Sequence, residues 1–310
     1  MSVSGVINTH FIVAYLLMQH GTEEQKTRFV PKALSGEEIW CQGFSEPGAG
    51  SDMANQQTFA ERRGDEWVVN GHKVWTSFGH FAQWMILIAR TSRDHKHDGI
   101  TYFLCPIEGH PGITVKPLVK MTGETGFNEV FLDDVVIPDS LRVDDVGKGW
   151  AVAMTTLTSE RGAAEGAGGG IASIHPVERL LTLARSTRRN GRIAAEDPVT
   201  RDAIVQEIIK QDGMRHTGRL GRVPALNDHP MRLALQSKVV SSEAEQSLDQ
   251  LGNAIAGAHS TLYKLDPAAP DEGHWPLSTM NVYGLTISGG SNEIQRNILG
   301  ERVLGLPKTK

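Results

Sequence analysis

This chain of 310 residues has few cysteines and fewer basic than acidic residues. Its two cysteines, Cys41 and Cys105, are too few for a disulfide framework and lack metal-ligand spacing, which indicates a reducing compartment and two ordinary strand residues. The formal net charge is -5, and no run of lysines or arginines is long enough to follow a phosphate backbone. We therefore expect neither a secreted disulfide scaffold nor a nucleic-acid partner.

Long apolar runs are missing as well. Residues 11–18 are apolar, but they are too few to span a bilayer and follow no basic leader, so they predict a buried helix. The one close histidine pair, His95 and His97, lies among loop-forming residues without a HExxH-like frame. The sequence predicts a solvated turn at these histidines in preference to a metal site, and a cytoplasmic protein without a membrane span.

Different kinds of secondary structure follow one another along the chain. Residues 1–39 read as helical, with Gly21 as a stop and a capping box from Thr22 to Gln25 that starts a second helix. Residues 40–140 hold short β-rich runs separated by glycine, proline and Asn70-Gly71, and this pair predicts a hairpin turn. No segment between these runs is long enough for a crossover helix, so we expect an antiparallel sheet or barrel.

Helical periodicity returns after residues 147–149 and characterises the last part, residues 141–310. A polar, arginine-rich stretch at residues 185–198 predicts a solvated connection, and helices resume near Val199. The proline-rich loop at residues 265–276 precedes a last helix, from about Asn292 to Leu304. This order predicts an α+β protein with N-terminal helices, a middle antiparallel β-domain and a C-terminal helical bundle.

Two segments carry the strongest chemical signal: FSEPGAGSD at residues 44–52 and NGHKVWTS at residues 70–77. Glycines let a backbone approach a planar or phosphorylated ligand closely, and the hydroxyl groups of Ser45, Ser51 and Ser77 can reach ring edges. Trp75 is large enough to cover the face of a planar ring. A glycine-rich loop alone is usually only a turn, whereas its ordered combination with a downstream tryptophan is much more specific.

In these two segments the chain resembles the acyl-CoA dehydrogenase family, and the similarity extends over nearly the whole sequence. It continues through residues 112–117, 127–130, 147–150 and 292–297. The resemblance implies an acyl-CoA dehydrogenase-like fold and an FAD-dependent enzyme that desaturates an acyl-CoA thioester between its α and β carbons. It also implies an electron-transferring flavoprotein as partner and a homo- or hetero-oligomer.

The resemblance further implies which residues bind the cofactor. The isoalloxazine ring of FAD would be held by the backbone at Phe44 and Ser45, the turn of Gly50 and Ser51, and the pair Trp75 and Ser77. At the start of the last helix, Ser291 and Glu293 complete the set. Ser291 is the predicted N-cap, and the positive helix end suits a reduced flavin or a phosphate. Simple helix capping by Ser291 is the alternative.

The reaction also needs a base for the α-proton, a carboxylate placed opposite FAD. Many family members carry this glutamate where the present chain has Gly289, which cannot take a proton. Residues 157–161 resemble instead the branch of isovaleryl-CoA and long-chain dehydrogenases, which implies Glu160 as base. Independently, Ala153, Leu157 and Glu160 share one helical face, where desolvation raises the pKa of a carboxyl group. The alternative is an ion pair of Glu160 with an arginine such as Arg161.

Substrate contacts are expected at Ser51, facing the pantetheine arm, at Arg161, and at Gly289, whose N–H can polarise the thioester carbonyl. Two features depart from the family pattern. Only 39 residues precede Trp40, so the N-terminal helices are expected to be truncated, and the patch that binds the adenine end of FAD in many relatives is RRNG at residues 188–191. A flavin oxidase or monooxygenase of the same fold, and a non-catalytic subunit that binds acyl-CoA or completes a partner's FAD site, therefore stay as alternatives.

Overall fold

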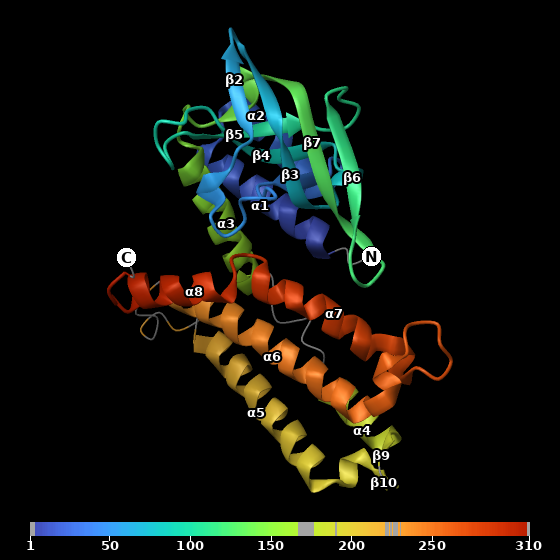
Figure 1. Ribbon diagram of the computed structural model, residues 1–310. Coiled ribbons are helices and arrows are strands. Elements are labelled where there is room, and N and C mark those ends of the chain that lie inside the picture. Colours follow the sequence, from blue (N-terminus) through green and yellow to red (C-terminus); the bar gives the residue numbers. More distant parts are fainter. Residues whose placement is uncertain are drawn as a thin grey trace. The chain divides into compact units, whose positions relative to one another are not determined.

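The computed structural model describes residues 4–166, 177–189, 191–220, 223, 225, 229 and 231–308. Side chains are described for residues 9–159 and for the described residues from 177 onward. The chain divides into two compact units, residues 1–163 and residues 164–310 (Figure 1). The first unit combines helices with a large sheet, and the second is mainly helical. The predicted three-part division, at residues 39/40 and 140/141, stays a prediction.

Two helices open the first unit, α1 (Ser4–His20) and α2 (Glu23–Ser35). The predicted capping box is confirmed, because the Thr22 hydroxyl accepts from the Gln25 amide and the Gln25 side chain accepts from the Thr22 amide. Gly36 ends α2 with a left-handed backbone, φ 73°. Local capping chemistry therefore sets both ends of α2.

The prediction of a buried helix at residues 11–18 is right for one face of α1 only. Ile12, Val13, Leu16 and Leu17 are buried in the core. Phe11, Tyr15 and Met18 are exposed, and their spacing places them in one stripe along the helix. An apolar stripe of this kind is typical of a surface that contacts another chain or segment.

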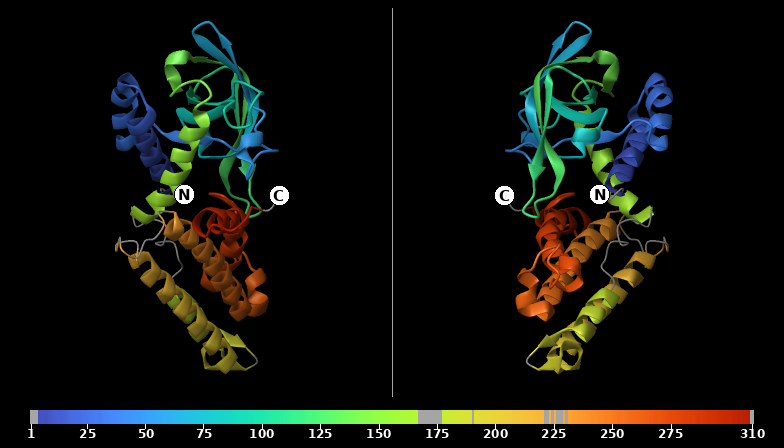
Figure 2. Two further views of the ribbon diagram at one scale, coloured as in Figure 1. Left: turned by 90° about the vertical axis from the view of Figure 1, so that its left-hand side faces the viewer. Right: turned by 90° about the vertical axis from the view of Figure 1, so that its right-hand side faces the viewer.

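An eight-stranded sheet forms the body of the first unit (Figures 1 and 2). Its strand order is β6-β7-β3-β2-β4-β5-β8, with β1 paired to β4. The predicted antiparallel arrangement holds for most neighbours, but β1 and β2 both pair with β4 in parallel. A parallel pair needs a long connection, which the β2–β3 hairpin and its flanking loops supply between β1 and β4. The strands are β1 (Trp40–Gly43), β2 (Phe59–Arg63), β3 (Glu66–Ser77), β4 (Trp84–Arg90), β5 (Ile100–Pro106), β6 (Ile113–Val119), β7 (Thr125–Pro138) and β8 (Arg142–Val143).

The predicted hairpin turn at Asn70-Gly71 is wrong, because both residues lie within β3. They sit at a register shift against β7, where the Asn70 side chain exchanges hydrogen bonds with Asp134 at 2.8 and 2.9 Å. Gly71 is needed for a close approach instead of a turn, since an added Cβ would lie 2.2 Å from the Thr58 hydroxyl oxygen. Asn-Gly therefore marks a bulge in this strand.

Two apolar clusters follow from the alternation of side chains along the strands. In β4, Ile86 and Ile88 belong to the cluster shared with α1 and α2, whereas Met85 and Leu87 belong to the cluster formed with β2, β3 and β7. Cys41 and Cys105 are free, buried strand residues of the second cluster, as predicted.

Helix α3 (Gly149–Gly166) begins where the sequence predicts the return of helical periodicity. Gly149 lies so close to β5 that an added Cβ would be 2.5 Å from the Thr101 carbonyl carbon. Ala153 is buried and Leu157 is partly buried against the cluster of α1 and α2. The sequence places Ala153, Leu157 and Glu160 on one helical face. The first two of these residues contact the core, as this pattern predicts.

The second unit is the predicted helical bundle, built on an apolar cluster around Trp275. Gly252 allows this ring to approach α6, since an added Cβ would lie 1.9 Å from the indole. The arginine-rich connection contains a short hairpin of β9 (Arg188–Arg189) and β10 (Arg192–Ile193). The last helix begins at Asn292, as predicted, and continues from Ile298 into a π-helical segment. The helices are α4 (Val177–Ser186), α5 (Pro198–Leu220), α6 (Arg232–Ala256), α7 (His274–Ile287) and α8 (Asn292–Ile298), with the π segment Leu299–Val303.

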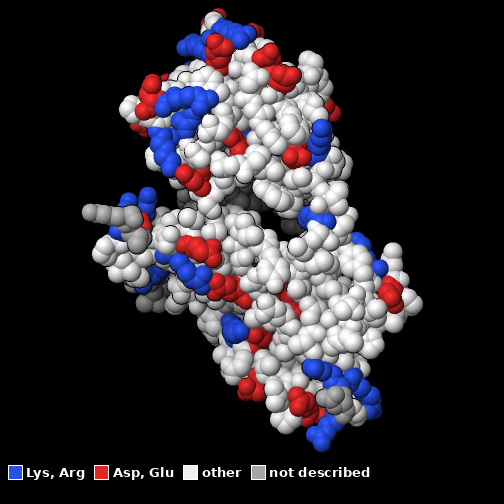
Figure 3. Space-filling view, viewed as in Figure 1, with Lys and Arg blue, Asp and Glu red and all other residues white. Residues whose placement is uncertain are grey.

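Short 3-10 turns complete the described chain: η1 (Met53–Asn55), η2 (Gly79–Phe81), η3 (Asp139–Leu141), η4 (Ala194–Glu196), η6 (Gly257–Thr261) and η7 (Pro270–Gly273). Among the helices in the described ranges, none combines the length and hydropathy required to cross a membrane. On the face shown in Figure 3, acidic and basic side chains are interspersed.

Candidate active site

The segment FSEPGAGSD follows directly on β1 and forms a tight turn. Phe44 is buried, and its ring meets that of Tyr102 edge-on with centroids 5.8 Å apart. Two backbone hydrogen bonds of 3.0 Å close the turn across residues 46–49. Gly50 and Ser51, which come next, are exposed. The segment is therefore anchored in the core at its start and presents its glycine-rich part to solvent.

The second segment belongs to β3, and a backbone hydrogen bond ties it to the first. The amide of Val74 donates to the carbonyl of Ser45 at 2.9 Å. The register of β3 against β7 shifts between Lys73 and Thr76, and within this β-bulge Trp75 has φ 61°. A left-handed backbone is uncommon for a bulky residue and is maintained only where the surrounding structure holds it, often at functional sites.

Trp75 is the exposed tryptophan of the protein. All six tryptophans lie in the described ranges, and Trp75 is 60% exposed while the other five are buried or partly buried. Its ring meets Phe127 of β7 edge-on, with centroids 5.8 Å apart, and Phe127 pairs in register with Ser77. The bulge therefore changes the direction of the Trp75 side chain relative to the regular alternation of a β-strand.

A buried ion pair joins the two segments, and the sequence reasoning missed it. Lys73 Nζ lies 2.8 Å from Glu46 Oε1, and both side chains are buried. The Lys73 ammonium also donates to the carbonyl of Phe44 at 3.2 Å and to the side chain of Gln56 at 2.9 Å. The available signal was a lysine inside an apolar strand, because a buried lysine requires partners.

Burial and pairing act in opposite directions on these two groups. Desolvation lowers the pKa of Lys73 to about 8, against the effect of Glu46, which raises it. Burial alone would raise the pKa of Glu46, but Lys73 and hydrogen bonds from Gln57 and Thr58 outweigh it, so the net pKa lies below its usual value. Both groups therefore carry charge at neutral pH.

Asn128 of β7 lies in the family-like segment at residues 127–130, but the sequence predicted no role for it. Its side-chain amide donates to the carbonyl of Thr76 at 2.9 Å, and its oxygen lies 3.0 Å from Nδ1 of His80. At the neighbouring Gly79, an added Cβ would lie 3.1 Å from Thr76 Cγ2, a tight contact. Asn128 thus holds the backbone of β3 immediately after Trp75.

The expected base, Glu160, belongs to α3, but its side chain and that of Arg161 lie outside the described side chains. One turn earlier, Thr156 is buried, and its hydroxyl lies 3.0 Å from that of Tyr102 in β5. The helix that carries Glu160 is therefore tied to the sheet through Thr156. The roles of Glu160 and Arg161 stay predictions.

The expected residues of the C-terminal part all lie in the second unit. Ser291 is the N-cap of α8, accepting from the Ile294 amide at 3.4 Å, which confirms the predicted cap. Glu293 is exposed in the first turn, where backbone and Ser291 hydrogen bonds hold its pKa below its usual value. Gly289 has φ 63°, and its carbonyl accepts from Gln295 at 2.7 Å. The structure thus brings these residues together at one helix end.

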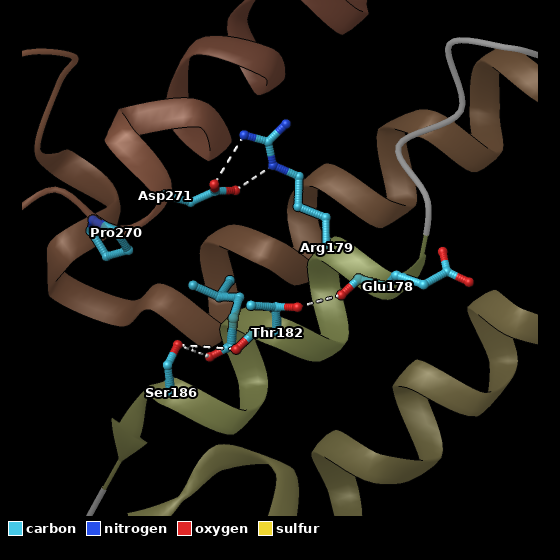
Figure 4. Close-up of a pocket in the computed structure, with 7 residues that line it drawn as sticks. Glu178, Arg179, Thr182, Ser186, Pro270 and Asp271 are labelled. Carbon is cyan, nitrogen blue, oxygen red and sulfur yellow. Dashed lines mark hydrogen bonds and ion pairs between the residues drawn. The ribbon is translucent and has the colours of Figure 1, made fainter.

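Among the described residues, other titratable clusters offer no comparable site. His95 and His97 are exposed in a loop, as predicted, and no group of three His, Cys, Asp or Glu in the described residues could hold a metal ion. A hollow of about 340 Å³ in the second unit is bordered by a bidentate ion pair from Arg179 of α4 to Asp271 of η7, at 2.5 and 2.9 Å (Figure 4). Neither of the expected segments contributes to it.

The residues present fit the isoalloxazine ring of FAD. A planar ring needs open backbone on one side and an aromatic surface, and the first unit supplies both. An added Cβ at Gly48 or at Gly50 would meet no atom within 4 Å, so this backbone is accessible. Trp75 supplies an exposed aromatic surface, and the Ser45–Val74 hydrogen bond links its strand to the glycine-rich turn.

A helix-flanked β-domain with these two segments, followed by a helical bundle, defines a class of flavin-binding oxidoreductases. Residues 41–135 match the family model of the acyl-CoA dehydrogenase middle domain, and residues 147–304 match that of the acyl-CoA dehydrogenase C-terminal domain. The chain belongs to the acyl-CoA dehydrogenase family. Its expected fold and its class, an oxidoreductase acting on acyl-CoA, are thereby confirmed.

Relatives and solved structures agree with this assignment. The acyl-CoA dehydrogenase IpdE1 of Mycobacterium tuberculosis is 39% identical over 295 residues, which cover 94% of this chain and 73% of that protein. The Tcur3481-Tcur3483 steroid ACAD is similar with a TM-score of 0.85 and 29% identity, covering 96% of this chain and 76% of that one. The ChsE4-ChsE5 complex from Mycobacterium tuberculosis has a TM-score of 0.84, 29% identity and the same coverage.

Proposed function

We propose that this chain is an FAD-dependent acyl-CoA dehydrogenase that desaturates an acyl-CoA thioester between its α and β carbons. The observation that carries the proposal is Trp75, held exposed in a β-bulge beside a glycine-rich turn, in a chain of this family. FAD, when bound, supplies the hydride acceptor for the β-carbon. The protein contributes the base, the alignment of the thioester and the exclusion of water.

In this proposal the backbone of the segment FSEPGAGSD and the residues Trp75 and Ser77 hold the flavin ring. Ser291 and Glu293 contribute at the start of α8, whose N-terminus favours negative charge. Ser51 and Arg161 contact the acyl-CoA, and the Gly289 N–H polarises the thioester carbonyl. These assignments rest on the family resemblance of the motifs and on the geometry within each unit.

Glu160 takes the α-proton in this proposal. Gly289 offers no carboxylate, so the base must come from elsewhere in the chain. Ala153 and Leu157 face the core of the first unit, and Glu160 continues the same helical face of α3. A carboxyl group on such a face is partly desolvated, which raises its pKa and makes it a better base near neutral pH.

The decisive experiment is a spectroscopic titration of the purified, FAD-reconstituted protein with acyl-CoA thioesters under anaerobic conditions. The panel contains short, branched and long acyl groups, together with steroid-derived acyl groups because two similar structures are a steroid ACAD and its variant. We expect loss of flavin absorbance near its visible maximum with at least one member. A folded protein that takes up no FAD would contradict the proposal.

Two further readouts separate the alternatives. Fast reoxidation of the reduced flavin by oxygen would indicate an oxidase or monooxygenase, whereas reoxidation by an electron-transferring flavoprotein supports a dehydrogenase with that partner. Binding of acyl-CoA without any flavin bleaching would indicate a non-catalytic subunit. The similar ChsE4-ChsE5 structure is a complex of two components, which favours a homo- or hetero-oligomer here as well. A cytoplasmic location is part of the same proposal.

A further inference from the structure

Lys73 and Glu46 are charged residues in the interior of the first unit, and neither touches solvent appreciably. We propose that this pair is a positioning device that holds the glycine-rich turn and the Trp75 bulge together as one unit. Lys73 and Glu46 are positioning residues here, because the segments that they join, and not their own side chains, would contact the flavin. For its consequence on FAD the inference rests on the proposed function.

The contacts of Lys73 show how one side chain reaches three parts of the site. Its ammonium group has three protons, and the structure provides an acceptor for each: Glu46 at 2.8 Å, the Phe44 carbonyl at 3.2 Å and Gln56 at 2.9 Å. The acceptors belong to the start, the turn and the far end of the loop between β1 and β2. Lys73 itself belongs to β3, two residues before Trp75.

Glu46 extends the network in the opposite direction. Its carboxylate accepts from the backbone amides of Gln57 at 2.5 Å and Thr58 at 3.0 Å, in addition to Lys73. Its own backbone closes the turn with Ala49 through two hydrogen bonds. The Glu46 carboxylate therefore connects the turn at the start of the β1–β2 loop to the end of that loop, at Gln57 and Thr58, and also to Lys73 of β3.

Energetics favour a positioning role over simple stabilisation. Removing two charges from water has a large cost, and a buried pair replaced by apolar residues of similar size is often no less stable. An apolar pair would fill the same space without directional bonds to the Phe44 carbonyl or to the amides of Gln57 and Thr58. The pair specifies where these backbone groups lie, which close packing alone does not achieve.

The placement matters because Trp75 is held in an unfavourable backbone conformation. Lys73 fixes the strand just before the bulge, and Asn128 fixes the Thr76 carbonyl just after it. Between these two anchors the hydrogen bond from Val74 to Ser45 links the bulge to the turn. Without the Lys73 anchor, the bulge can relax toward a regular strand, which would move Trp75 away from the turn.

Hydrogen exchange measured by mass spectrometry on the flavin-free chain tests the coupling, with the double variant E46Q/K73M as the main probe. This variant removes both charges with little change in side-chain volume and leaves no buried charge unpaired. The matched control is E23Q/K26M, which makes the same chemical change in an exposed pair of the same length, 2.8 Å, on α2. FAD affinity and the visible spectrum of bound flavin are measured for each protein.

We expect peptides covering residues 44–58 and residues 73–79 of E46Q/K73M to exchange together at least about ten-fold faster, with β4 and β5 unchanged. FAD affinity should fall by at least about ten-fold, with an altered flavin spectrum, whereas the control stays within about two-fold of the unsubstituted protein. The inference is overturned if only one segment responds, if the whole first unit responds equally, or if FAD affinity is unchanged.

A measurement on the unsubstituted chain decides the case even if E46Q/K73M does not fold. In native-state exchange at low denaturant, the two segments should open as one unit with one free energy and one denaturant dependence. Separate opening of the two segments would overturn the inference. If the unsubstituted protein binds no FAD, the proposed function fails, while the exchange results still decide whether the pair couples the segments.

Discussion

The hydroxyl groups of Tyr102 and Thr156 lie 3.0 Å apart in the interior of the first unit. This contact joins β5 to α3 one turn before Glu160. Thr156 also donates to the carbonyl of Val152 within α3, so its own hydroxyl keeps a partner if Tyr102 is changed. This hydrogen bond between sheet and helix therefore depends on Tyr102.

Replacement of Tyr102 by Phe should lower the free energy of unfolding by about 0.5 to 1.5 kcal/mol, because it removes one buried hydrogen bond and little volume. Urea denaturation followed by circular dichroism measures the change. Tyr283→Phe is the matched control, since Tyr283 is exposed and should give no measurable difference. Equal effects of the two substitutions would show that the contact with Thr156 contributes nothing.

Trp75→Ala should alter the flavin and leave the fold intact. The side chain is largely exposed, so the free energy of unfolding of the flavin-free chain should change by no more than about 0.5 kcal/mol. The visible spectrum of bound FAD and the rate of acceptor reduction should both change. Phe81→Ala, at another exposed aromatic residue, serves as control. The role assigned to Trp75 is wrong if its removal changes neither spectrum nor rate.

Glu160→Gln should slow flavin reduction by acyl-CoA by roughly 100-fold to 10,000-fold, the usual contribution of a general base. Acyl-CoA affinity should change far less, because size and hydrogen bonding are kept. Stopped-flow reduction and equilibrium titration measure the two quantities, with Glu61→Gln as an exposed control. Near-normal bleaching by the Glu160→Gln protein would reject the assignment.

A glutamate introduced at position 289 should restore part of the rate of flavin reduction that is lost when Glu160 is removed. In Glu160→Gly with Gly289→Glu, the carboxylate moves to the site that many family members use, and we expect faster flavin reduction than in Glu160→Gly alone. Recovery will be incomplete, since a displacement of about 1 Å can cost on the order of 100-fold. Gly289 also has φ 63°, so any side chain there adds backbone strain.

Asp249 of α6 should make the stability of the second unit depend on pH. It is 0% exposed, accepts one hydrogen bond from Ser278 at 2.7 Å, and its Oδ1 has no hydrogen-bond partner in the described structure. Burial raises its pKa to about 6. The folded state therefore binds this proton more tightly than the unfolded state, whose carboxyl has its ordinary pKa near 3.8.

The sign of the effect follows from that difference. The contribution of the protonated carboxyl is complete below about pH 4 and is lost as the pH rises to about 6. Asp249→Asn should consequently be more stable than the unsubstituted protein at pH 7.5, by on the order of 1 to 3 kcal/mol, with the advantage vanishing near pH 4. Thermal denaturation at several pH values checks this, and an advantage independent of pH would contradict it.

Association of the chain should depend on the exposed stripe of α1. Phe11, Tyr15 and Met18 are all exposed on that helix, and apolar surface of this kind favours self-association, a partner subunit or low stability of the chain alone. Sedimentation velocity should detect oligomers of the unsubstituted chain. The triple variant Phe11→Ser, Tyr15→Ser, Met18→Ser should form fewer of them. A stable, fully active monomer of the unsubstituted chain would contradict this prediction.

Much of the architecture follows from local patterns in the sequence. The capping box at Thr22 and the N-cap at Ser291 are confirmed because a cap is formed by residues within one turn of each other. Hydrophobic periodicity likewise predicts the strands of the middle region and the helices that follow, since it reports which face each element buries. The two motif segments identify the family for the same reason: their residues are adjacent in sequence.

Tertiary structure alone decides the features that depend on distant residues. Asn70-Gly71 has the sequence of a hairpin turn but lies inside β3, because Thr58, which precedes β2, and Asp134 of β7 pack against it. Lysine is usually a surface residue, and the sequence alone does not show that Lys73 is buried. The fold brings its ammonium group within 2.8 Å of Glu46, which lies 27 positions away in the sequence. The left-handed backbone of Trp75 is likewise unpredictable from local propensity, since the registers of β3 and β7 create the bulge that contains it.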